Sequence, residues 1–287
     1  MTQEKFILIK TLSAFSSFCE ENHLTYYAAY GTALGAVRHH GFIPWDDDID
    51  VHMPRTDYQR LLEMRDKIPS PYQLADISER GYTAPFMKFM DMSTTIWEFE
   101  RIPYMLGVYI DIFPLDECSE DVAKVRVLKK KLDDTFFTYF RSLEKWSTKE
   151  LLWCLVHRDW NNSECILKKK YHHFFKQESY HHQVVRLLNE LSSYPTGSFY
   201  VSSADVYIDD AIFKKEWFGT PVEMPFENIT IKVPEDCDGY LRFLYGNYMQ
   251  LPSEDERISH HSRYFVSLDR GYTIKEARKL LKKRLMR

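Results

Sequence analysis

Apolar residues recur three and four positions apart near the start of the chain, and this spacing predicts a helix over residues 3–22 with one apolar face. The short apolar run 26–30 predicts a buried strand. Gly31-Thr32 then predicts a turn that leads into a second helix over residues 33–39. The chain therefore opens with a helix, a strand, a glycine turn and another helix.

An acidic run, formed by Asp46, Asp47, Asp48 and Asp50, follows this opening and leads into further predicted strands. Beyond it, alternating apolar and polar residues predict a strand over 49–53, and the next helix is expected to begin at Thr56 or Asp57. Four later apolar runs bounded by turn residues predict strands over 72–75, 85–90, 95–99 and 106–113. We therefore expect residues 1–118 to form a mixed sheet with flanking helices, which serves as the catalytic core.

The pattern changes twice after this sheet. Residues 119–195 have helical spacing with many aromatic and basic side chains, which predicts a separate helical region. Residues 196–287 are expected to pack back on the core and complete the site. In this last segment we expect strands at 199–202 and 229–233, a helix at 236–244, and a basic helix from Ile274. These elements together predict an α+β fold.

Composition excludes several classes of protein. The 287 residues carry a formal net charge of -4, which argues against a nucleic-acid partner, because phosphate backbones are bound by clustered Lys and Arg. The five cysteines are odd in number and scattered, which favours a reducing compartment over a disulfide framework or a zinc site. The N-terminus lacks the pattern of a secretion signal, and no apolar stretch has the length of a spanning helix. We expect a cytoplasmic protein whose membrane contact, if any, is peripheral and at the inner face.

The acidic run carries the strongest candidate for chemistry. In a strand, Asp48 and Asp50 would project from the same face, and two neighbouring anions need a cation. Carboxylates at this spacing suit Mg²⁺, which takes oxygen ligands and shares its other positions with substrate phosphates. Asp111 lies in an otherwise apolar strand, where a lone carboxylate is costly unless it is paired or binds metal. We therefore expect Asp48, Asp50 and Asp111 to be the metal ligands.

A phosphate site is expected beside these acids. Gly31 and Thr32 would offer free N-H groups and a hydroxyl at the start of a helix. Arg38 and Lys88 are candidates to neutralise phosphate charge, although an ordinary surface salt bridge is the alternative for Arg38. A solvated turn is the alternative for the acidic run. The order of glycine turn, helix, acidic strand and second acidic strand favours a nucleotidyltransferase-like core instead.

Three segments resemble one known family. Residues 31–50, GTALGAVRHHGFIPWDDDID, closely resemble the signature of the LicD family, and residues 111–116, DIFPLD, resemble its second block. Tyr245-Gly246-Asn247-Tyr248-Met249, followed by Pro252, Arg257 and His260, is similar to its C-terminal block. Residues 120–195 carry no matching motif.

The resemblance implies a nucleotidyltransferase fold and an Mg²⁺-dependent phosphotransferase. Such an enzyme moves phosphocholine, or a related phospho-alcohol, from a CDP-choline-like donor to a sugar hydroxyl of a bacterial surface glycan. Teichoic acid, lipopolysaccharide and capsule are the acceptors considered, including lipid-linked forms. By the same resemblance Asp48, Asp50 and Asp111 bind metal, Gly31 and Thr32 hold the pyrophosphate, and Arg38 and Lys88 steady phosphate oxygens.

Other residues have weaker assignments. Asp46 and Asp47 are expected to shape the loop or raise the local negative field, and Asp116 to form a turn after Pro114. The paired histidines match no zinc-ligand spacing, but His260 is a candidate general base for the acceptor hydroxyl. Trp45, beside the acids, is an aromatic candidate for contact with a trimethylammonium group.

Two other functions compete with phosphocholine transfer. A true nucleotidyltransferase would use the same metals to place a nucleoside monophosphate on a sugar or small molecule, and would release pyrophosphate rather than CMP. A catalytically silent module would bind glycan or protein. Three clustered acids argue against the silent module, because binding alone does not need them.

Overall fold

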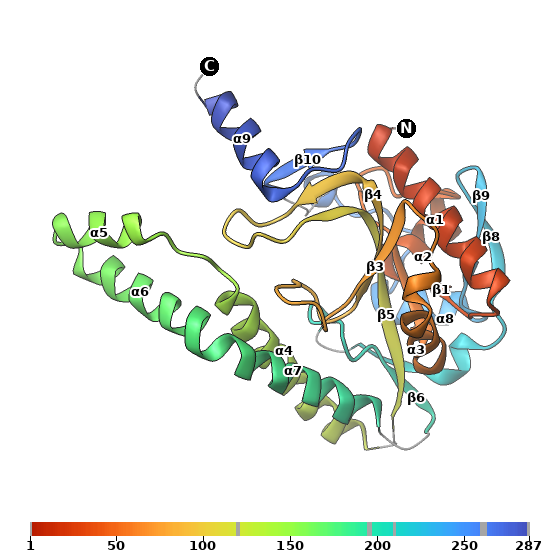
Figure 1. Cartoon of the computed structure of the whole chain (residues 1–287). Coiled ribbons are helices and arrows are strands. Elements are labelled where there is room, and N and C mark those ends of the chain that lie inside the picture. The colour runs from red at the N-terminus through yellow and green to blue at the C-terminus, as the bar shows by residue number, and fades with distance from the viewer. Residues whose placement is uncertain (1, 119–120, 194–196, 209–210, 259–262, 286–287) are drawn as a thin grey trace.

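A mixed β-sheet forms the centre of the molecule (Figure 1). The computed structural model describes residues 2–118, 121–193, 197–208, 211–258 and 263–285. The sheet runs in the order β1-β2-β5-β4-β10; β3 pairs with β4, and β6 continues from β5 to β7. Its strands are β1 (Tyr27–Ala28), β2 (Asp50–Pro54), β3 (Tyr72–Ala75), β4 (Met87–Trp97), β5 (Leu106–Cys118), β6 (Phe199–Val201), β7 (Ile212–Lys214) and β10 (Phe265–Ser267). The helices and this mixed sheet confirm the predicted α+β class.

Strand pairing places three polar residues side by side at the centre of the sheet. β2 pairs with β5 in parallel and puts Asp50 opposite Asp111. β4 pairs with β5 in antiparallel and puts Lys88 opposite the same Asp111. The order of the strands, and not proximity in the sequence, therefore brings the acidic run to the second acidic strand.

The N-terminal helix covers one face of this sheet. Thr2 caps the N-terminus of helix α1 (Gln3–Glu21), and its hydroxyl accepts a hydrogen bond from the Lys5 N-H. Its apolar face is fully buried at Leu12 and Phe15, and the Phe15 ring meets Phe89 of β4 edge to face. Apolar burial of this kind is the main term that holds a helix on a sheet.

Two shorter helices flank the sheet near the acidic run. They are α2 (Tyr30–His39) and α3 (Arg55–Glu63), and α3 is followed by the 3-10 turn Arg65–Lys67. Helix α2 begins at Tyr30, which has a positive φ of 43°, so Gly31 and Thr32 lie inside its first turn. The sequence placed them in a turn ahead of the helix. Because Gly31 and Thr32 are the second and third residues of α2, their backbone N-H groups are among those at the helix N-terminus.

The middle of the chain is helical, as predicted. It contains α4 (Val122–Ser142), α5 (Thr148–Val156), α6 (Trp160–Tyr171), a π-helical turn (His172–Lys176) and α7 (Gln177–Ser192). Helices α4 and α7 pack on the body through a second apolar cluster that includes Leu132, Phe136 and Leu187. Helices α5 and α6 extend away from the sheet as an arm (Figure 1).

The C-terminal segment returns to the sheet and adds elements that the sequence pattern missed. It contains β6, β7, a 3-10 turn (Lys215–Phe218), the hairpin β8 (Val222–Phe226) and β9 (Ile229–Val233), α8 (Cys237–Tyr245), a 3-10 turn (Glu254–Glu256), β10 and α9 (Ile274–Leu285). Short strands such as β7 and β10 are three residues long and give almost no periodic signal. The boundaries 1–118, 119–195 and 196–287 stay a prediction.

Two expectations about the central strands were wrong. The strands predicted at 85–90 and 95–99 form one strand, β4, whose register shifts between Asp91 and Ile96. Asp116 does not form a turn: it lies fully buried in β5, where its carboxylate accepts hydrogen bonds from Arg55 Nε at 2.5 Å and Nη2 at 2.8 Å. The Arg55 partner comes from α3 and could not be read from the local sequence.

Among the residues that the structure describes, no helix is long and apolar enough to cross a membrane.

Candidate active site

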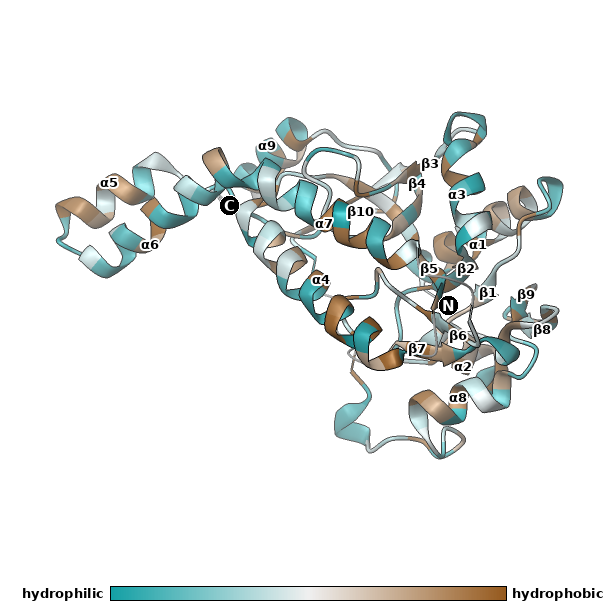
Figure 2. Cartoon of the chain, turned by 90° about the horizontal axis from the view of Figure 1, so that it is seen from below, coloured by the Kyte–Doolittle hydropathy of each residue, from teal (hydrophilic) through white to brown (hydrophobic). Residues whose placement is uncertain are grey.

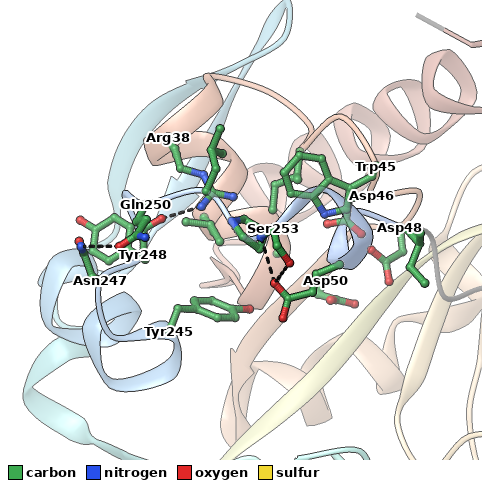
Figure 3. A pocket seen from close by; sticks show the side chains of 17 residues that line it. Arg38, Trp45, Asp46, Asp48, Asp50, Tyr245, Asn247, Tyr248, Gln250 and Ser253 are labelled. Carbon is green, nitrogen blue, oxygen red and sulfur yellow. Dashed lines mark hydrogen bonds between the residues drawn. The ribbon is translucent and has the colours of Figure 1, made fainter.

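A pocket of about 780 Å³ opens beside the first turn of α2 (Figure 3). One wall is acidic and comes from Asp46, Asp48 and Asp50. The opposite wall comes from the C-terminal segment and includes Tyr245 and Tyr248. The pocket therefore joins the first and third predicted regions of the chain.

The acidic run is a loop that enters β2. Asp48 lies in the loop, and Asp50 is the first residue of the strand. The argument that strand alternation puts Asp48 and Asp50 on one face was therefore wrong in detail. Both carboxylates nevertheless line the same pocket, because the loop turns Asp48 toward it.

The carboxyl group of Asp50 lies in a strongly negative environment. Burial raises its pKa well above the usual value, and the neighbouring carboxylates of Asp48, Asp111 and Asp46 raise it further. Desolvation and like charges both disfavour an anion. A cation bound here would relieve the repulsion, so the donor set has the chemistry of a site for a hard divalent ion.

Lys88 holds Asp111, which lies on β5 directly opposite Asp50 of β2. The Lys88 Nζ donates a hydrogen bond to Asp111 Oδ1 at 2.6 Å, and the ammonium lies 3.5 Å from the centre of the Tyr109 ring. Lys88 is 4% exposed and does not line the pocket. The structure thus places Lys88 with Asp111 rather than at the open phosphate position expected from the sequence.

Gly31 and Thr32 hold the acidic loop in place. A Cβ on Gly31 would lie 2.5 Å from Asp46 Oδ2, so only glycine allows the carboxylate to come this close to the helix. The Thr32 hydroxyl accepts a hydrogen bond from the Asp50 N-H at 2.9 Å, and its side chain is buried. Gly31 lines the pocket, whereas Thr32 lies behind it. Their predicted contact with a pyrophosphate stays a prediction.

Arg38 lies on the last turn of α2 and lines the pocket. Its Nη1 donates a hydrogen bond to the Tyr248 carbonyl at 2.6 Å (Figure 3), and partial burial lowers its pKa. No acidic partner of Arg38 is found in the described part of the chain, so the surface salt bridge considered as the alternative for Arg38 is absent there. Arg38 instead ties α2 to the C-terminal wall.

Aromatic side chains stand around the acids. Trp45 lies beside Asp46 in Figure 3, and the Arg257 guanidinium lies 5.5 Å from the centre of its ring. Burial raises the pKa of the Tyr245 hydroxyl, and the charges of Asp50, Asp46 and Asp48 raise it further, so the hydroxyl stays protonated. Residue-level reasoning gave Tyr245 and Tyr248 no role. The one signal for them was the motif at Tyr245-Gly246.

A buried tyrosine fixes the C-terminal wall to the start of α2. The Tyr240 hydroxyl accepts a hydrogen bond from the Tyr30 N-H at 3.0 Å and lies 3.1 Å from His52 Nε2. Burial lowers the His52 pKa to about 3, so this imidazole is neutral. The sequence analysis missed Tyr240, because nothing in α8 indicates a partner more than 200 residues away.

The structure does not place every predicted site residue. His260 lies outside the described residues, and its role as a base stays a prediction. Over the described ranges, no group of three or more His, Cys, Asp or Glu side chains is arranged to hold a metal ion. Asp48 and Asp50 line the pocket directly, whereas Asp111 is engaged by Lys88 below them.

The part of the chain that carries these residues is similar to known proteins. Residues 23–142 match the family model described as LicD/FKTN/FKRP, nucleotidyltransferase domain. This match covers α2, the acidic loop, β2, β4 and β5, which together carry Asp48, Asp50, Lys88 and Asp111.

Curated relatives extend the similarity. The lipopolysaccharide cholinephosphotransferase LicD of Haemophilus influenzae is 26% identical over 275 residues, which cover 91% of this chain and 96% of that protein. An uncharacterized protein of Rickettsia prowazekii is 35% identical over 66 residues, covering 23% of this chain and 21% of its own length. A second uncharacterized protein, from Rickettsia typhi, is 44% identical over 45 residues, 15% of each chain. Residues 23–142 thus match the LicD family model, and the similarity to one protein named LicD extends over nearly the whole chain.

Proposed function

We propose that this protein transfers phosphocholine, or a related phospho-alcohol, from a CDP-activated donor to a sugar hydroxyl of a bacterial cell-surface glycan, with Mg²⁺ as cofactor. The observation that carries the proposal is the pocket in which Asp46, Asp48 and Asp50 face the tyrosines of the C-terminal wall, with Arg38 of α2 also lining it. The Haemophilus relative, named as a lipopolysaccharide cholinephosphotransferase, supports the choice of the group moved and of lipopolysaccharide as one acceptor. Teichoic acid and capsule are alternative acceptors with the same kind of hydroxyl.

Asp48 and Asp50 would hold the magnesium ion. Mg²⁺ is usually bound by one or two carboxylates, with water and substrate phosphates in its other positions, so two pocket aspartates suffice without a preformed set of three. When bound, the ion would neutralise charge on the donor's phosphates and orient them for displacement. Asp46, packed against Gly31, adds negative charge that favours its recruitment.

Asp111 and Lys88 would support this site from below. The Lys88 ammonium pairs with the Asp111 carboxylate and fixes its direction. From the register position opposite Asp50, Asp111 can approach the metal as a third ligand. Lys88 would then act through Asp111 and not by direct contact with phosphate.

Arg38 and the aromatic wall would bind the donor. A guanidinium has five N-H donors, and Arg38 uses its Nη1 on the Tyr248 carbonyl and its Nε on His39 Nδ1, which leaves Nη donors for phosphate oxygens. The ring faces of Trp45 and Tyr245, beside three carboxylates, suit the trimethylammonium head of choline. Because the Tyr245 hydroxyl stays protonated next to Asp50, it can donate a hydrogen bond to an anionic oxygen.

A base for the acceptor hydroxyl completes the proposal. His260 is our candidate because imidazole accepts a proton near neutral pH. His260→Ala should lower the rate of transfer to the acceptor more than the rate of donor binding. Unchanged turnover of this variant across the pH range would remove the role.

The donor assay tests the function directly. Purified protein is incubated with Mg²⁺, a glycan extract and either CDP-choline, CTP or ATP, and CMP and pyrophosphate are both followed. CMP from CDP-choline that depends on acceptor would support phospho-alcohol transfer. The family model's description as a nucleotidyltransferase domain favours one alternative, transfer of a nucleoside monophosphate, and pyrophosphate release from CTP or ATP would select it.

The proposed location rests on the scattered cysteines, which favour a reducing compartment. We place the enzyme in the cytoplasm, at the inner face of the membrane when its acceptor is lipid-linked. Fractionation of cells that express a tagged full-length chain would test this assignment.

A further inference from the structure

In the arm formed by α5 and α6, apolar residues, drawn in brown, lie along α5 (Figure 2). The inner face of α5 is buried at Leu151 and Cys154, which pack against Ile166 of α6. This contact accounts for the position of α5 on α6. It leaves the other side of α5 facing away from the rest of the molecule.

That outer face is apolar where an ordinary surface helix is polar. Leu152, Trp153 and Val156 are 56%, 59% and 76% exposed. With Lys149 they occupy positions i, i+3, i+4 and i+7, so the four side chains share one side of the helix. A helix with apolar residues on both sides is expected to be covered on both sides.

The charges around this face are mainly positive. Residues 144–176 contain seven Lys and Arg but four Asp and Glu, in a chain whose net charge is -4. Three of the acids are used within the body or the arm: Glu150 pairs with Arg101, Glu144 with Lys169, and Glu164 with Lys168. Residues 144–176 therefore carry a net positive charge, which would complement an anionic surface.

We propose that the outer face of α5 docks on an anionic phospholipid surface, with Leu152, Trp153 and Val156 in the headgroup region and Lys149 on lipid phosphates. Tryptophan and lysine are the side chains typical of helices that lie at a membrane surface. A second copy of the chain is disfavoured as the occupant, because two turns of helix offer much less than the roughly 800 Å² per partner of a stable interface. The proposal does not depend on the proposed function, since no active-site residue takes part.

Vesicle flotation of the full-length chain, without donor or acceptor, tests the docking. We expect wild-type protein to float with vesicles that contain phosphatidylglycerol and to remain unbound with phosphatidylcholine alone. Trp153→Glu should lower the partition onto anionic vesicles about tenfold or more, because it replaces a ring that would enter the headgroup region with a negative charge. Lys149→Glu should lower it about tenfold and weaken its dependence on salt, since it reverses one charge at the surface.

Val127→Glu is the matched control. Val127 is 71% exposed on α4, outside the arm, so the same added charge should leave vesicle binding unchanged. Wild-type protein that binds neither vesicle, or Trp153→Glu protein that binds as well as wild type, would overturn the proposal. Light scattering that shows a wild-type dimer, lost in Trp153→Glu without any vesicle binding, would also overturn it and assign the face to a second copy.

Discussion

Replacement of one glycine should separate the geometry of the site from the stability of the fold. Gly31 lies in the first turn of α2, and an alanine Cβ there would stand 2.5 Å from Asp46 Oδ2, whereas ordinary contacts begin at 3.4 Å. The Asp46 carboxylate would have to move by about 1 Å. The atom that must move is the end of a side chain, so the backbone can stay in place.

The two effects of Gly31→Ala have opposite signs. Alanine in place of glycine in a helix stabilises it by up to about 1 kcal/mol, so we expect the free energy of unfolding to be unchanged or slightly higher. A displacement of about 1 Å in an active site can lower a rate about 100-fold. We therefore expect turnover to fall by about 10-fold to 100-fold, which corresponds to about 1.4 to 2.7 kcal/mol in the activation barrier.

Gly35→Ala is the matched control on the same helix. Its Cβ would lie 2.4 Å from the carbonyl oxygen of Gly41, a backbone atom that cannot turn away. We expect a loss of stability of about 1 to 3 kcal/mol from this overpacking. Urea unfolding and the rate of CMP release would be measured for both variants. Wild-type turnover in Gly31→Ala, or an equal loss of stability in the two variants, would refute the reasoning.

Three further predictions follow from individual contacts. Thr32→Val should leave the partly buried Asp50 N-H without its acceptor and lower stability by about 0.5 to 1.5 kcal/mol together with activity. Thr32→Ser should preserve both, and equal unfolding midpoints for the two variants would contradict the role of the hydroxyl. Arg55→Met should cost about 3 to 5 kcal/mol, because it removes the charged partner of the fully buried Asp116 and leaves that carboxylate only the hydrogen bond from the Ser203 hydroxyl. Turnover of the remaining folded protein should be normal, and stability within about 0.5 kcal/mol of wild type would show that the pair is dispensable. Mg²⁺ at about 100 times its dissociation constant should stabilise wild-type protein by about 2.7 kcal/mol and leave the stability of Asp50→Asn unchanged. Thermal unfolding measures this, and an equal rise in the unfolding temperature of both proteins would place the ion elsewhere.

The sequence predicted long periodic elements and the order of the site residues. Helices such as α1 and α3 have clear apolar spacing, and the acidic run is recognisable without any structure. The arrangement of β2 beside β5, which brings Asp50 to Asp111, agrees with the idea that a second acidic strand lies next to the first.

The rest depended on contacts between distant parts of the chain. Lys88 looked like a phosphate ligand until the β4-β5 register placed it against Asp111. Asp116 looked like a turn former because its Arg55 partner lies on another element. The C-terminal wall, with Tyr240 bonded to the start of α2, is joined across more than 200 residues and leaves no local pattern.

The most direct test of the central claim is CMP release from CDP-choline by wild-type protein and by Asp48→Asn, measured with Mg²⁺ and a glycan acceptor. The account predicts CMP release by wild type that stops when Mg²⁺ is chelated, and loss of at least about 1000-fold in Asp48→Asn with an unchanged fold. Wild-type rates in Asp48→Asn, or pyrophosphate from a nucleoside triphosphate in place of CMP from CDP-choline, would contradict it.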